Sequence, residues 1–95
     1  MRVVLTAEAR QELREATQWY AVRSYRAAQR FVAAYKNARQ LIQDGPEQWA
    51  EIEPGVRRVL LRKFPYSLLY AVEDDKLVVL VVKHHKRHPD YWRER

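Results

Sequence analysis

The sequence predicts a single α+β domain in which an antiparallel hairpin of two helices packs on a small antiparallel sheet. Three observations lead to this prediction. Residues 7–23 and 25–43 carry apolar side chains at steps of three and four residues, as amphipathic helices do. The second half of the chain has short β-prone runs instead, which end in the apolar stretch Leu77–Val82. The 95 residues are enough for one domain, 1–95, and include no linker or internal repeat.

The first elements are a short strand and an amphipathic helix. Arg2 to Leu5 is a β-prone run, and Thr6 follows in the position of a helix N-cap. Glu8 lies in the first turn, where a carboxylate complements the helix dipole. We expect this helix from Ala7 to about Arg23. Its apolar stripe comprises Ala9, Leu13, Ala16 and Tyr20, with Trp19 beside it.

A second helix is expected from Tyr25 to Gln43, with Ser24 as its N-cap. Asp44-Gly45-Pro46 ends it, because glycine can adopt the left-handed conformation and proline cannot continue a helix. Almost no linker separates the two helices, which predicts an antiparallel hairpin whose apolar faces cover a flat surface. The second stripe comprises Ala28, Phe31, Val32, Tyr35, Ala38, Leu41 and Ile42.

Three further strands are expected to supply that surface. Val56–Phe64 alternates in part, and Tyr66–Val72 is rich in aromatic and β-prone residues, with Leu68, Tyr70 and Val72 on one face. Leu77–Val82 has no polar residue, so we expect it to be a central strand whose valines and Leu80 are almost fully buried. The expected order is therefore β-α-α-β-β-β, with residues 43–54 as the one sizeable loop.

Composition limits the classes of function. The chain has 18 Lys and Arg against 12 Asp and Glu, and its net charge of +6 favours an acidic partner: nucleic acid, an anionic protein or an anionic membrane. It has no cysteine, which suits a reducing cytoplasm and excludes disulfides and thiolate metal sites. The apolar runs are too short for a signal peptide or a membrane span. We therefore expect a cytoplasmic protein with no membrane partner. The sequence contains no phosphate-binding glycine motif, so we do not expect a nucleotide-dependent enzyme.

Two segments of the second half resemble the ParE branch of the ParE/RelE toxin superfamily. The first matches the pattern R-x-F-P-Y-x-hydrophobic-x-Y at Arg62, Phe64, Pro65, Tyr66 and Tyr70. The second matches V-x-H-x-x-R-x-P-x-x-W at Val82, His84, Arg87, Pro89 and Trp92. The resemblance covers nearly the whole chain in the same element order. It departs from the family at Lys83 and in the dense His84–His88 run.

The resemblance implies the toxin of a type II toxin–antitoxin system, without a cofactor. In the ParE branch the implied action is inhibition of DNA gyrase by binding, with no catalytic residues to assign. The implied partner is a ParD-like antitoxin, acidic and partly disordered, through which the complex would bind its own operator. The target-binding residues that we expect are Arg62, His84, Arg87, Pro89 and Trp92.

The alternative is a RelE-like, ribosome-dependent mRNA endonuclease. Such a metal-free nuclease needs a base, an acid and cations that stabilise the phosphorane. The candidates for base and acid are His84, His85 and Tyr91, and those for the cations are Arg62, Lys63 and Arg87. We also expect the basic residues of two strands to converge near one sheet edge, namely Arg57, Arg58, Arg62 and Lys63 from one strand and Lys83, Lys86 and Arg87 from the other.

Two further expectations concern partners and ligands. An antitoxin segment is expected in the outer groove of the helix hairpin, with a second contact along the cationic sheet edge; the residues are Trp19, Tyr20 and Tyr35, then Arg58 and Arg62. Trp92 is expected to fasten the C-terminal segment to the sheet, and Trp49 to border a partner site. We expect no metal site, because the histidine run leads into Pro89 and is not helical. A DNA-binding or scaffold module is the remaining class, but no helix resembles a recognition helix.

Overall fold

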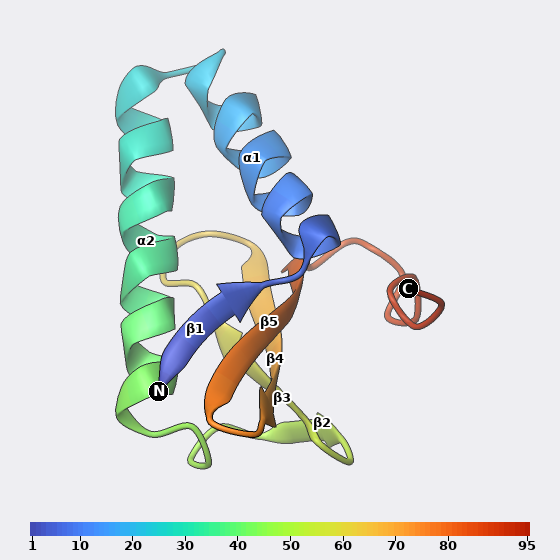
Figure 1. The fold of residues 1–95 in the computed structure, drawn as a ribbon. Helices are drawn as coiled ribbons and strands as arrows, with labels where there is room; N and C mark the ends of the chain where they lie inside the picture. Colours follow the sequence, from blue (N-terminus) through green and yellow to red (C-terminus); the bar gives the residue numbers. More distant parts are fainter.

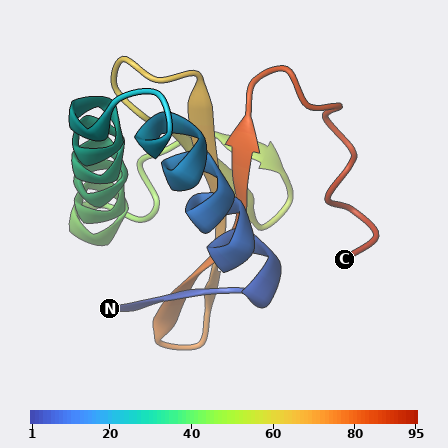
Figure 2. The same ribbon diagram turned by 90° about the horizontal axis from the view of Figure 1, so that it is seen from above.

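The computed structural model describes residues 1–95 and places two helices on one face of a five-stranded sheet (Figure 1). The elements are β1 (Arg2–Leu5), α1 (Ala7–Ala21), α2 (Tyr25–Asp44), β2 (Glu51–Glu53), β3 (Val56–Leu60), β4 (Tyr66–Glu73) and β5 (Lys76–His84). Seen from above, the C-terminal segment after β5 lies on the side of the sheet away from α2 (Figure 2). No helix is long and apolar enough to cross a membrane.

The sheet is mixed, which corrects the expectation of an antiparallel one. Its strand order is β1-β5-β4-β3-β2, and β1 runs parallel to β5 while the other neighbours are antiparallel. The sequence of β1, only four residues long, does not indicate whether its neighbouring strand runs parallel or antiparallel to it. The expected loop 43–54 also contains β2, a short edge strand that is too small and too polar to stand out in the sequence.

β5 is the interior strand that its apolar sequence predicts. It lies between β1 and β4, and Leu77, Val79 and Val81 have no exposed surface. Leu80 is only half-buried, contrary to expectation. The reason is a bulge: Leu69 pairs with Val81 and the next residue of β4 pairs with Val79, so Leu80 is left without a partner.

One smaller expectation about the sheet is also wrong. β3 begins at Val56 as expected but ends at Leu60 and does not continue to Phe64. Val72, in the same alternating run of β4 as the fully buried Leu68 and Tyr70, is 41% exposed. It lies near the end of β4, next to the exposed turn 74–75, where the core no longer covers the sheet.

The helix hairpin forms the main core with the near face of the sheet. Residues of both helices are buried there: Ala9, Ala16, Phe31, Ala38 and Ile42. They pack on Val59, Leu68, Tyr70, Leu77, Val79 and Val82. A smaller core lies on the opposite face and consists of Val56, Leu69, Val81 and Trp92. Both faces of the sheet therefore contain buried apolar residues.

Both helices begin at the residues that the sequence predicts, with the expected N-caps. The Thr6 side chain accepts a hydrogen bond from the N–H of Ala9 at 3.1 Å, and Ser24 accepts one from Ala27 at 3.2 Å. α1 ends at Ala21, two residues earlier than expected. Gly45 follows α2 with φ of −153°, so it does not adopt the left-handed conformation that we expected. A Cβ there would instead come within 2.8 Å of the side chain of Gln48.

Candidate functional site

The last residue of β5 and the residues after it form a closing segment, residues 84–95, which is fastened to the far face of the sheet. The N–H of His85 donates to the carbonyl of Pro65 at 2.9 Å, where the segment leaves β5. Trp92 is only 9% exposed and packs in the smaller core, and its indole N–H donates to the carbonyl of Pro89 at 2.9 Å. The prediction that Trp92 fastens the segment is confirmed. Its burial makes it a structural residue, so it offers little surface to a target.

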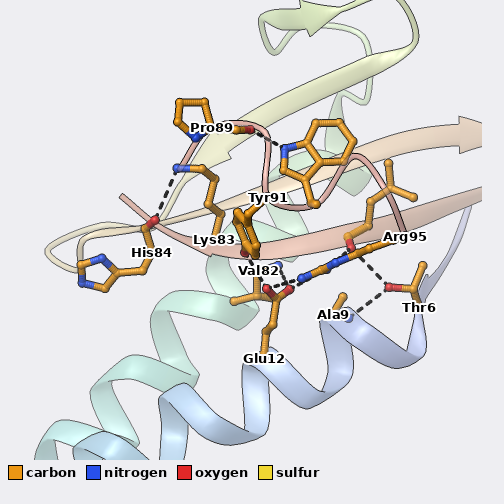
Figure 3. Close-up of polar contacts among 11 residues, drawn as sticks. Thr6, Ala9, Glu12, Val82, Lys83, His84, Pro89, Tyr91 and Arg95 are labelled. Carbon is orange, nitrogen blue, oxygen red and sulfur yellow. Dashed lines mark hydrogen bonds and ion pairs between the residues drawn. The ribbon is translucent and has the colours of Figure 1, made fainter. Parts of the chain in front are cut away.

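The other attachment of the closing segment is to α1 (Figure 3). The carboxylate of Glu12 accepts hydrogen bonds from the hydroxyl of Tyr91 at 2.5 Å and from the guanidinium of Arg95 at 2.6 Å. Burial and the bond to Glu12 raise the pKa of Tyr91 far above its usual value. The phenol therefore stays protonated, and its O–H is already engaged as the donor of the hydrogen bond to Glu12. Tyr91 is a poor candidate for the acid or base of a nuclease.

A first hollow, the α1 hollow, lies between α1 and the end of the β4–β5 pair. Its lining includes Glu12, Trp19, Tyr20, Tyr66, His84 and Arg87. The ring of His84 packs edge-on against Tyr66, with 4.9 Å between centroids, and its Nδ1 accepts from the N–H of Lys86 at 3.0 Å. Burial, followed by the proximity of the basic residues His85, Lys86 and Lys83, lowers the pKa of His84. Its imidazole is therefore neutral at pH 7.

A second hollow, the sheet-face hollow, lies on the opposite face of the sheet. Its lining includes Arg58, Ser67, Leu69, Lys83, His85, Trp92 and Arg93. The buried hydroxyl of Ser67 is hydrogen-bonded to Nε2 of His85 at 3.0 Å. Arg93 forms ion pairs with Glu53 and with Asp90. Because the charge of Arg93 is paired, the positive charge at the border of this hollow comes from Arg58 and Lys83.

The structure separates the six nuclease candidates. His84, Arg87 and Tyr91 line the α1 hollow, whereas His85, the first residue after β5, lines the sheet-face hollow together with Lys83. Arg62 and Lys63 are exposed in the turn between β3 and β4 and line neither hollow. These six side chains do not surround a common space where a phosphate could lie.

The expected convergence of basic residues is correct for Arg58 and Lys83 alone. Arg57 instead donates to the backbone carbonyls of Glu47 and Trp49 and pairs with Glu51, which ties β3 to the preceding loop. The cations are spread over both faces because side chains alternate along a strand. No three His, Asp or Glu side chains form a group that could hold a metal ion.

A third depression, the hairpin groove, runs between the two helices. Only residues of the helices and of their connection line it, and the apolar ones are Leu13, Trp19, Val22, Val32 and Tyr35. Trp19 is 51% exposed, and the guanidinium of Arg23 lies 3.7 Å from its ring centroid. Half-exposed tryptophan in an apolar groove is typical of a protein–protein contact.

The structure places the expected antitoxin contacts in different positions. Trp19 borders the hairpin groove, whereas Tyr35 is 5% exposed and forms part of its floor. Tyr20 faces the α1 hollow and packs on Phe31 with 5.2 Å between ring centroids. Trp49, expected to border a partner site, packs against the main core, and its indole N–H donates to the carbonyl of Leu41 at 3.3 Å.

Sequence reasoning missed several of the residues that build these hollows. Glu12 is read from the sequence only as a charge beside the apolar stripe of α1, and Ser67, Arg93 and Arg95 carry no signal. Tyr91 and Arg95 lie 79 and 83 residues from Glu12 along the chain. No local spacing could reveal such contacts.

Comparison with known proteins identifies the class and then the family. A helix hairpin on a mixed sheet is also the fold of a solved structure described as the chromosomal ParDE TA system from P. aeruginosa. The two chains share 24% identity with a TM-score of 0.67, and the match covers 88% of this chain and 95% of that one. The family model of the ParE toxin of type II toxin–antitoxin systems, parDE, matches residues 3–89. The chain belongs to this family, as its sequence motifs predict. No curated protein is significantly similar to it.

Proposed function

We propose that this ParE-family toxin inhibits DNA gyrase by binding, with the outer side of the closing segment as its contact. The observation that supports binding over cleavage is the separation of the nuclease candidates between two faces of the sheet. By contrast, His84 and Arg87 lie together at the α1 hollow, while Pro89, also expected at the contact, is exposed and lines the sheet-face hollow. A contact made by binding alone needs a fixed and accessible surface, and does not need a convergent acid and base.

A supercoiling assay with purified gyrase tests this proposal. We expect the wild-type protein to reduce supercoiling or to trap cleavage complexes, while message on translating ribosomes stays intact. Arg87→Ala should weaken the inhibition, because Arg87 is exposed and lines the α1 hollow. Normal supercoiling with cut message would contradict the proposal and support a RelE-like nuclease. In that case, replacing His84, His85 or Tyr91 should abolish cutting.

We further propose that a ParD-like, acidic and partly disordered antitoxin neutralises the protein by folding onto the hairpin groove. The groove offers Trp19 and other apolar anchors, and the net charge of +6 attracts an acidic chain. A second contact is proposed at Arg58 and Arg62, which are both exposed. Calorimetry with the product of the neighbouring small gene tests the pairing. Binding weaker than micromolar that ignores charge reversal at Arg58 and Arg62 would contradict it.

Operator binding is proposed for the complex, with the antitoxin as the DNA-binding partner. Both helices of this chain turn their apolar stripes to the sheet, and the surface between them is the apolar hairpin groove. Because the sequence of neither helix resembles a recognition helix, the DNA contact is assigned to the antitoxin. A gel-shift assay on the operator should show a complex with toxin and antitoxin together but none with the toxin alone.

A further inference from the structure

We infer that Glu12 is a positioning residue for the target contact: its carboxylate holds Tyr91 and Arg95, and through the ring of Tyr91 it orients Arg87. The inference rests on the proposed function, which places Arg87 at the contact with gyrase. Glu12 belongs to α1, far in the sequence from the closing segment that it holds. It therefore links the helix hairpin to the part of the molecule that is proposed to act on the target.

The carboxylate of Glu12 uses both of its oxygens (Figure 3). Oε2 accepts from the Tyr91 hydroxyl at 2.5 Å and from Nη2 of Arg95 at 2.6 Å. Oε1 accepts from Nη1 of Arg95 at 3.0 Å and from the backbone N–H of Val82 at 3.1 Å. Arg95 is thus bound through two of its nitrogens, a geometry that fixes direction as well as distance. The side chain of Glu12 is only 15% exposed, so the surrounding protein limits its solvation.

The position of Glu12 follows from the short length of β1. β1 pairs with β5 only as far as Val79, so the edge of β5 beyond that point has no neighbouring strand. Side chains take its place. The N–H of Val82 donates to Glu12, and the carbonyl of Leu80 accepts from the hydroxyl of Thr6 at 3.3 Å and from Arg95 at 3.2 Å. With the same carboxylate, Glu12 therefore accepts a hydrogen bond from the open edge of β5 and binds the closing segment.

The link from Glu12 to Arg87 passes through an aromatic ring. The Arg87 guanidinium lies 4.0 Å from the ring centroid of Tyr91, within the range of a cation–π contact. The Tyr91 hydroxyl is held by Glu12, which restricts the rotation and tilt of the ring. All three side chains line the α1 hollow together with His84. Without Glu12, the ring would lose its fixed orientation, and Arg87 would lose the surface on which it lies.

This attachment adds to the one made by Trp92. Trp92 is buried in the smaller core on the far face of the sheet and the ring of Tyr91 packs against that core, while Glu12 links Tyr91 and Arg95 to α1. Loss of Glu12 should therefore free the α1 side of the closing segment and leave the fold intact. A residue needed only for stability would not produce that combination.

The test compares Glu12→Gln with the matched control Glu94→Gln. Both variants replace one carboxylate by an amide, but Glu94 lies exposed in the closing segment and takes part in none of the contacts of Glu12. We expect Glu12→Gln to weaken gyrase inhibition about tenfold, because charge-assisted hydrogen bonds to Tyr91 and Arg95 are lost. Trypsin should cut it faster after Arg87, while its affinity for the antitoxin stays within about twofold. Glu94→Gln should match the wild type in each assay.

The results separate this inference from the proposed function. If the wild-type protein does not inhibit gyrase, the proposed target is wrong; positioning by Glu12 is then judged by faster trypsin cleavage and by loss of growth arrest in cells. If Glu12→Gln retains the wild-type cleavage rate and inhibition, the inference is overturned. Should that variant fail to fold, Tyr91→Phe removes only the hydroxyl bond. It is expected to change inhibition and cleavage in the same direction, and wild-type values for it would overturn the inference equally.

Discussion

Individual side chains decide how the C-terminus of this toxin is arranged. Trp92 fills the smaller core beside Leu69 and Val81, and Tyr91 packs against the same core while its hydroxyl donates to Glu12. Two adjacent aromatic residues thus attach the segment to the sheet and to α1. This arrangement leaves His84 and Arg87 on the exposed side of the segment, where a partner can reach them.

Trp92→Ala should destabilise the whole protein and also reduce toxicity. The indole is 9% exposed, and its removal leaves a cavity beside Leu69 and Val81. Truncation of a buried tryptophan costs about 3–5 kcal/mol, and the lower end applies here because the ring lies near the surface. Urea denaturation measures the loss. A variant with unchanged stability but no toxicity would mean that Trp92 contacts the target directly.

His84 should titrate below its usual range. Burial and the neighbouring basic residues His85, Lys86 and Lys83 lower the pKa of His84 from 6.5, so the unfolded chain binds more protons than the folded one as pH falls below 6.5. The contribution of His84 to folding stability is therefore present above pH 6.5 and is lost on acidification. An NMR titration of the imidazole should give a midpoint below 6.5. A midpoint at or above this value would contradict the desolvated position against Tyr66.

At the scale of elements, capping and small side chains explain why the hairpin forms where it does. Thr6 and Ser24 begin the two helices, and Ala9 and Ala16 let α1 approach the sheet closely. Thr6 has a second role, because its hydroxyl also donates to Leu80 on the open edge of β5. The cap of α1 and the end of the β1–β5 pairing are therefore made by one residue.

Thr6→Ala should cost about 1–2 kcal/mol of stability, since the N-cap bond and the bond to Leu80 are lost together. Thr17→Ala is the matched control. The Thr17 hydroxyl donates to the carbonyl of Leu13 within α1, a bond that adds little to a helix. Thermal melting of both variants measures the difference. Equal melting temperatures would mean that neither contact of Thr6 contributes to the fold.

At the scale of the whole molecule, patterns within one element were predictable and contacts between distant elements were not. The ends of α2 and the burial of β5 follow from local periodicity and from unbroken hydrophobicity. The parallel direction of β1 and the contact of Glu12 with Tyr91 depend on where the hairpin returns the chain. The separation of the histidine run onto two faces depends on where β5 ends, and the structure places that end at His84.

Charge and apolar surface occupy different parts of this molecule, and they should control different rates of antitoxin binding. The net charge of +6 acts over a distance and steers an acidic partner, whereas Trp19 in the hairpin groove acts only after contact. Raising the salt from about 0.05 M to about 0.5 M should therefore slow association about tenfold or more and change dissociation little. Trp19→Ser should do the reverse, with faster dissociation and nearly normal association. Tyr25→Ser is the matched control, because Tyr25 is 73% exposed and does not line the groove. Stopped-flow fluorescence resolves the two rates.

Two outcomes would place the antitoxin elsewhere on the surface. One is an association rate that does not change with salt, and the other is a Tyr25→Ser variant that dissociates as fast as Trp19→Ser.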